Sequence, residues 1–183
     1  KAGGHFVQAR TDAEAGTDLL ERQILMESLG DDPLNEELLK KFAFLNAKEL
    51  NRKGIKNQEH RTHAQKTALS ALYKDIITNY IDEGRVAEAD ALFKTAFVVG
   101  NLTDKDKANL SAKLRLRTVD LRARQNLLNL NLALPDGSET EYNKEADKLS
   151  PDDAKALKEL IKDDFVVRRR AKTEAVDAIK EKL

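Results

Sequence analysis

The fold is decided by residues 103–134, which read TDKDKANLSAKLRLRTVDLRARQNLLNLNLAL. The segment begins with Thr103, whose hydroxyl can cap a free backbone N–H, and with two carboxylates that favour the positive end of a helix. No Gly or Pro interrupts the chain from there to Pro135. At 1.5 Å per residue, about 30 residues of helix extend over about 45 Å. We therefore predict one long central helix over these residues.

Apolar residues form two rows on roughly opposite sides of this predicted helix when successive residues are placed about 100° apart. The first row consists of Leu110, Leu114, Leu121, Leu128 and Leu132, and the second of Leu116, Val119, Leu127, Leu130 and Leu134. A helix that faces water on one side needs only one apolar row, so we expect neighbours on both sides, from this chain or from other copies. The predicted subunit contacts are Leu116, Val119, Leu127 and Leu130.

Start and stop signals divide the rest of the chain into further helices. Residues 1–11 lack helical periodicity and are predicted to be a flexible N-terminal segment. Helices are predicted over residues 12–29, 33–54, 57–84, 85–100, 138–149 and 150–183, with a turn at Pro135-Asp136-Gly137 and a capping box from Ser138 to Glu141. The pattern indicates an all-α fold of six to seven helices, an extended bundle around the central helix. We expect a helical domain over 12–134 and C-terminal helices over 138–183.

Composition limits the classes of protein to which the chain can belong. The 183 residues are 40% apolar and 35% charged, with a net charge of zero and no Cys. The neutral balance does not indicate binding of nucleic acid or membrane by the whole surface, and the lack of Cys excludes thiol catalysis and cysteine metal sites. No apolar run approaches the ~20 residues of a membrane span. The chain opens with Lys1 and its only Met is Met26, so we expect a piece of a longer protein.

Candidate catalytic and metal-binding residues are few. His60 and His63 share a helix face, but a metal site needs further ligands and the sequence indicates none. The carboxylate pairs Asp31-Asp32 and Asp152-Asp153 stand at predicted helix starts, where capping explains them. We therefore predict no catalytic, cofactor-binding or metal-binding residues, and expect a protein that is not an enzyme.

Basic residues gather on the central helix and again in the last helix. The candidate nucleic-acid contacts are Lys113, Arg117, Arg124, Arg168, Arg169 and Arg170. Such residues can bind phosphates without reading sequence. The alternative is that they pair with acidic residues on the same helices, because acids also lie on these helices and no aromatic residue beyond Phe165 interleaves with the basic ones for base stacking.

A resemblance to a known class of proteins lies in residues 80–93, YIDEGRVAEADALF, followed by Ala96 and then by Gly100-Asn101-Leu102-Thr103. The stretch resembles helical segments of tailed-phage internal virion proteins of the core or DNA-ejection type. In those proteins a Gly-Arg-x-x-Glu-Ala helix is followed by a Gly-x-Leu-Thr link into a long helix. The same stretch is similar to a tetratricopeptide helix pair, although no second copy recurs at the 34-residue period. The resemblance covers about a quarter of the chain.

The phage resemblance implies a non-enzymatic structural segment that is ejected during DNA delivery and forms a homo-oligomeric ring or tube. Its implied partners are other virion proteins and non-specifically bound DNA. Its implied location is the virion interior and then the host cell envelope on ejection. Two alternatives stay open: a cellular, cytoplasmic helical scaffold or adaptor, and the non-catalytic part of a cell-wall-lytic virion enzyme.

Overall fold

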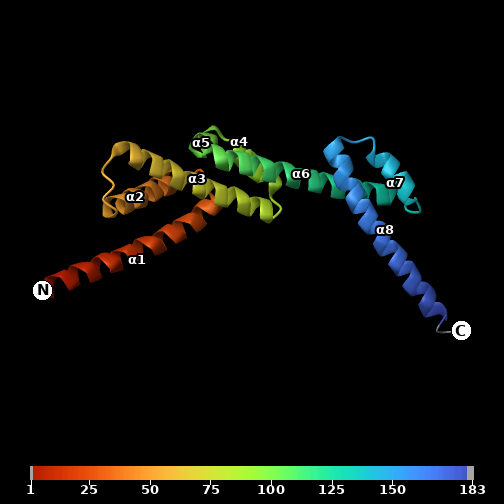
Figure 1. The fold of residues 1–183 in the computed structure, drawn as a ribbon, viewed down its shortest axis with the longest axis horizontal. Coiled ribbons are helices and arrows are strands. Elements are labelled where there is room, and N and C mark those ends of the chain that lie inside the picture. The colour runs from red at the N-terminus through yellow and green to blue at the C-terminus, as the bar shows by residue number, and fades with distance from the viewer. Residues whose placement is uncertain (1, 181–183) are drawn as a thin grey trace. The chain divides into compact units, whose positions relative to one another are not determined.

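The computed structural model describes residues 2–180, and within them the side chains of residues 14–95, 97–178 and 180. Residues 2–180 form eight α-helices and no strand (Figure 1). The helices are α1 (Ala2–Asp31), α2 (Glu36–Arg52), α3 (Gln58–Asp82), α4 (Val86–Lys94), α5 (Ala96–Asn101), α6 (Asp104–Ala133), α7 (Glu139–Ala146) and α8 (Pro151–Lys180). The predicted all-α fold with one long helix near residues 103–134 is confirmed, and the predicted number of helices was too small.

The extra helix arises at Thr95, inside the segment predicted as one helix over residues 85–100. Thr95 is extended, with φ −63° and ψ 129°, and it separates α4 from α5. Its hydroxyl donates to the carbonyl of Ala91 at 3.2 Å and its N–H donates to that of Leu92 at 3.1 Å. Threonine side chains that bond to the preceding turn compete with the continuing helix, which gives this break a local cause.

Two helices begin at residues other than those predicted from the sequence. Helix α1 begins at Ala2, so residues 2–11, predicted as a flexible N-terminal segment, belong to a helix; Lys1 lies outside the described residues. A glycine inside a helix costs only about 1 kcal/mol relative to alanine, so the early glycines did not prevent helix formation. Helix α2 begins at Glu36 and not at Pro33, because the Asn35 side chain accepts hydrogen bonds from the N–H groups of Glu37 and Leu38.

The chain divides into two compact units, Lys1–Ala112 (unit 1) and Lys113–Leu183 (unit 2). The boundary between the units falls inside α6. The reason is that α6 supplies apolar residues to both units, so that neither core is complete without part of this helix.

Helix α3 is the centre of unit 1, since α1, α2, α4 and α5 all pack against it. Its apolar side is buried and consists of Leu72, Tyr73, Ile76, Ile77, Tyr80 and Ile81. In unit 1 the organising element is therefore α3, where the sequence analysis expected the long helix to take that role.

A glycine follows the end of α2 and another follows the end of α3. Gly54 and Gly84 have φ of 68° and 83°, which side chains with a Cβ rarely adopt. After each glycine the next N–H bonds back to the helix: Ile55 to Leu50 at 3.0 Å, and Arg85 to Tyr80 at 2.8 Å. These Schellman-type ends satisfy otherwise free carbonyls, and the predicted stops at both glycines are confirmed.

The start of α6 is tied to α3 through Ser70, a buried polar residue. Its hydroxyl donates to the Asp106 carboxylate at 2.6 Å and accepts from the Thr103 N–H at 2.9 Å. The Thr103 hydroxyl in turn accepts from the Asp106 N–H at 3.2 Å, which is the predicted cap. These hydrogen bonds hold the carboxyl pKa of Asp106 below its ordinary value, with the Ser70 bond as the largest cause.

Unit 2 is built around Tyr142, which packs with Ala123, Ala146, Leu157 and Ile161. Its ring meets Phe165 edge-on at 5.2 Å, and its hydroxyl donates to the Leu134 carbonyl at the end of α6 at 2.7 Å. The predicted capping box between Ser138 and Glu141 is present, and so is the predicted turn, closed by the Gly137 N–H on Leu134.

The two apolar rows of α6 are covered to different extents. Leu110 and Leu114 of the first row are buried. In unit 2 the second row packs on the Tyr142 core through Leu127, Leu130 and Leu134. The later residues of the first row, Leu121, Leu128 and Leu132, are 38%, 53% and 74% exposed. The neighbours expected along both rows are thus only partly supplied by this chain.

Candidate functional site

The arginines predicted to contact nucleic acid on α6 are engaged with acidic neighbours. Arg117 and Arg124 both pair with Asp120, at 2.8 and 3.1 Å. Arg115 and Arg122 reach across to Asp152 and Asp153 at the start of α8. The predicted contact Lys113 is half-buried. The arginines of this cluster therefore form ion pairs with acidic residues of the chain, as the alternative to nucleic-acid contact predicted.

The three arginines of the predicted basic cluster on α8 have different surroundings. Arg168 pairs with Asp164 at 2.7 Å and donates to the Asn131 side chain at 2.8 Å. Its guanidinium also lies 5.0 Å from the ring centre of Phe165 and 5.6 Å from that of Tyr142. Arg168 is thus part of the packing of unit 2. Arg169 pairs with Glu139 across to α7 at 3.4 Å, and Arg170 is exposed.

A different set of cations on α8 was missed in the sequence. Lys155, Lys158 and Lys162 line a shallow surface hollow of about 460 Å³ with Pro151, Ala154 and the exposed Glu159. We call these six residues the α8 basic face, because its lysines outnumber its glutamate. Lys158 pairs with Asp147 of α7, while Lys155 and Lys162 form no ion pair among the described residues. Their spacing of three and four residues was a visible signal of one shared helix face, but they are separated along the chain and form no dense basic run.

Another hollow is a groove of about 520 Å³ between α1 and α3. Its floor contains Met26, Leu72 and Ile76, and its rim carries Glu27, Asp31, Asp75 and Glu83. We call these seven residues the acidic groove. Glu27, Asp31 and Asp75 are exposed and form no ion pair with any described side chain. The groove therefore combines an apolar floor with uncompensated negative charge.

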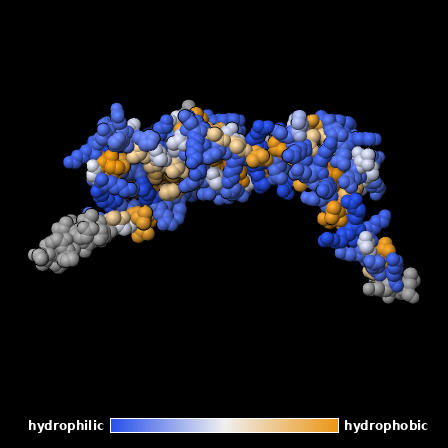
Figure 2. Space-filling view, in the orientation of Figure 1, coloured by the Kyte–Doolittle hydropathy of each residue, from blue (hydrophilic) through white to orange (hydrophobic). Residues whose placement is uncertain are grey.

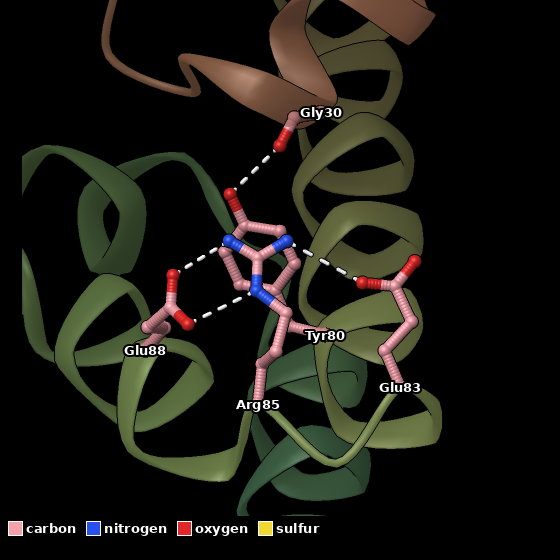
Figure 3. Close-up of polar contacts among 5 residues, drawn as sticks. All are labelled: Gly30, Tyr80, Glu83, Arg85 and Glu88. Atoms are coloured by element: carbon pink, nitrogen blue, oxygen red, sulfur yellow. Dashed lines mark hydrogen bonds and ion pairs between the residues drawn. The ribbon is translucent and has the colours of Figure 1, made fainter.

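Arg85 is the one basic residue that lines the acidic groove, and its charge is already engaged (Figure 3). The guanidinium lies 3.9 Å above the Tyr80 ring and binds both oxygens of Glu88, at 2.6 and 3.0 Å, while Glu83 lies at 3.4 Å. The hydrogen bond from Arg85 lowers the pKa of the Glu88 carboxyl. Tyr80 donates to the Gly30 carbonyl at 2.7 Å, near the end of α1. This cluster links α1, α3 and α4, and it leaves Glu27, Asp31 and Asp75 of the groove without an ion pair among the described residues.

A second hollow, of about 380 Å³, lies between α1 and α2 and contains a network of ion pairs. The buried Asp18 is held by Lys48 and Arg52, both at 2.8 Å, and Glu49 is held by Arg22 at 2.7 Å and Lys53 at 2.6 Å. The pKa of the Asp18 carboxyl is lowered chiefly by the hydrogen bond from Lys48, and that of Glu49 chiefly by the bond from Lys53. Because every charged group here has a partner, the network serves to join α1 to α2.

The residues predicted as a subunit interface are placed unequally. Leu127 and Leu130 pack on the Tyr142 core, Val119 is half-buried, and Leu116 is 71% exposed. The uncovered apolar surface of α6 in unit 2 thus includes Leu116 and also Leu121, Leu128 and Leu132, and we call the last three residues the exposed leucine row. Apolar patches also interrupt the hydrophilic surface of α8, where Val166, Val167 and Val176 are exposed (Figure 2).

The candidate metal-binding side chains do not form a cluster among the described residues. His60 and His63 lie on the exposed first turns of α3. Among the described residues no group of three or more His, Asp or Glu side chains is arranged to hold a metal ion. Within the same residues, no helix is both long enough and apolar enough to cross a bilayer.

Comparisons with known proteins found no matching protein-family model, no matching curated protein and no matching solved structure.

Proposed function

We propose that this chain is a structural, non-enzymatic segment that assembles with copies of itself into a homo-oligomer. The exposed leucine row carries this proposal. Leu121, Leu128 and Leu132 are spaced by seven and four residues, the spacing of a helix-pairing seam. Full burial of a leucine side chain contributes about 1.5–3 kcal/mol, so covering this row with the same row of another copy would favour association.

The sequence resemblance in residues 80–103 supports a particular setting for this assembly. We propose a tailed-phage virion protein that is stored inside the particle and ejected during DNA delivery, with the oligomer forming a ring or a tube. Other virion proteins would then be its neighbours, and non-specific DNA contact would fall to exposed cations such as Arg170.

The test is the solution mass of the chain by light scattering across protein concentration. We expect a discrete multimer for the unaltered chain. Leu128→Asp should reduce the mass while leaving the helical circular dichroism unchanged, because this side chain is exposed. Ala133→Asp is the matched control, since it places the same charge on an exposed position of α6 outside the row. A monomer at every concentration would overturn the proposal.

A second candidate function, a scaffold or adaptor, is favoured by the acidic groove. Paired helices with a hollow between them suit the binding of an extended or helical peptide. This reading predicts a chain that stays monomeric and binds a basic peptide with a one-to-one ratio. Calorimetric titration with a lysine-rich amphipathic peptide separates it from the assembly proposal.

A further inference from the structure

We propose that the acidic groove of one copy receives the α8 basic face of a second copy, so that the chains associate head to tail. This inference rests on the proposed function, because it names the surfaces that join the copies. It differs from pairing through the exposed leucine row, which brings the same surface of two copies together. A contact between two different surfaces repeats from copy to copy and produces a closed ring or an open filament.

The acidic groove carries negative charge that this chain does not match among its described residues. Glu27 and Asp31 stand one turn apart on α1, and Asp75 lines the groove from α3. None of these three forms an ion pair among the described residues, whereas acidic side chains such as Asp18, Glu49 and Glu88 do. Arg85 does not compensate them, because Glu88 and Glu83 already bind its guanidinium.

Helix α8 carries a basic surface that is complementary in charge to the acidic groove. Lys155 and Lys162 are two turns apart, about 10 Å along the helix axis, and both are exposed without an ion pair among the described side chains. The same hollow is lined by Ala154, by Lys158, which pairs with Asp147, and by the exposed Glu159, so its three lysines outnumber one glutamate. The face therefore keeps a net positive charge, which suits the carboxylates at the rim of the groove.

The two units of the chain have net charges of opposite sign. Residues 1–112 contain 16 Lys or Arg and 18 Asp or Glu, and residues 113–183 contain 16 Lys or Arg and 14 Asp or Glu. The chain is neutral, but unit 1 has a net charge of −2 and unit 2 of +2. A second copy therefore presents a surface of opposite sign to each unit, and complementary charge fixes the pairing of the right surfaces.

The test uses charge reversal in the full chain. Glu27→Lys/Asp75→Lys reverses the groove, and Lys155→Glu/Lys162→Glu reverses the helix face. Each double variant should weaken self-association, measured by sedimentation equilibrium, by about tenfold or more, because attraction is replaced by repulsion. The chain that carries all four substitutions should recover the association, because both surfaces have exchanged sign. Glu21→Lys, an exposed position on α1 outside the groove, should have no comparable effect.

Two further measurements complete the test. The neutral variant Glu27→Gln/Asp75→Asn should weaken association less than the reversal, and circular dichroism should show that all variants keep their helices. High salt should weaken the association, because the screening length falls from about 10 Å at 0.1 M to about 3 Å at 1 M.

The possible outcomes are distinguishable. If the unaltered chain is monomeric, the proposed function fails. If it is multimeric but the reversals leave its mass unchanged, or the fourfold variant does not recover, the head-to-tail contact alone is overturned. It is also overturned if Lys155→Glu/Lys162→Glu abolishes binding to a DNA duplex and leaves self-association intact, since the lysines then serve DNA.

Discussion

At the scale of single residues, Ser70 shows how one buried hydroxyl can join two helices. It bonds both to the Asp106 carboxylate and to the Thr103 N–H, so its removal leaves two half-buried polar groups with fewer partners. Ser70→Ala should lower the free energy of unfolding by about 1–3 kcal/mol, measured by urea denaturation. The control Thr67→Ala removes an exposed hydroxyl from the same helix and should change stability by less than about 0.5 kcal/mol. Equal midpoints for the two variants would contradict this role of Ser70.

Asp18 gives unit 1 a pH-dependent contribution to stability. Its folded-state pKa lies below the ordinary value of 3.8, chiefly because of the hydrogen bond from Lys48. A group with a lowered folded pKa contributes stability above its unfolded pKa and loses it as the pH falls through the folded pKa. The stability difference between the unaltered chain and Asp18→Asn should therefore be constant from about pH 7 to pH 5 and shrink below pH 3.8. Chemical denaturation at several pH values measures it, and a difference that does not change with pH would exclude the ion pairs as its source.

At the scale of elements, the turn between α6 and α7 depends on the absence of a side chain at Gly137. A Cβ at this position would lie 2.8 Å from Cε1 of Tyr142 and 3.0 Å from Cβ of Leu134. The Tyr142 ring is fully buried and cannot move aside easily. Gly137→Ala should therefore destabilise unit 2 by about 1–3 kcal/mol.

The matched control for this substitution is Gly16→Ala. Gly16 lies in α1 with open space around its Cα, so alanine should stabilise the helix by up to about 1 kcal/mol. Thermal unfolding followed by circular dichroism should thus show shifts of opposite sign. A Gly137→Ala chain as stable as the unaltered one would mean that the turn adjusts without cost.

The elements also show which features of the fold the sequence could predict. The starts and stops at Gly54, Gly84 and Ser138 were predictable, because each depends on residues within one turn of the chain. The break at Thr95 was not, because threonine is compatible with a continuing helix and with a helix end. The central position of α3 was not predictable either, since it depends on which helices pack together.

The candidate surfaces, too, could be predicted from the sequence only in part. The basic residues and apolar rows of α6 were visible in the sequence, and so was the pairing of Arg117 and Arg124 with Asp120 on the same helix. The pairing of Arg115 and Arg122 with Asp152 and Asp153, and the covering of Leu127 and Leu130 by the Tyr142 core, depend on α7 and α8. The acidic groove could not be predicted, because its carboxylates come from two helices about 45 residues apart in the chain.

At the scale of the whole molecule, the division inside α6 predicts which fragments fold. The core of unit 2 needs Ala123, Leu127 and Leu130 from α6 as well as Tyr142 and Ile161 from α7 and α8. A fragment of residues 113–183 should therefore unfold cooperatively in urea. A fragment of residues 138–183, cut at the boundary expected from the sequence, should lose cooperative unfolding and much of its helical signal, because one wall of the core is missing. If the shorter fragment unfolds as cooperatively as the longer one, α6 is dispensable for this core and the boundary belongs after residue 134.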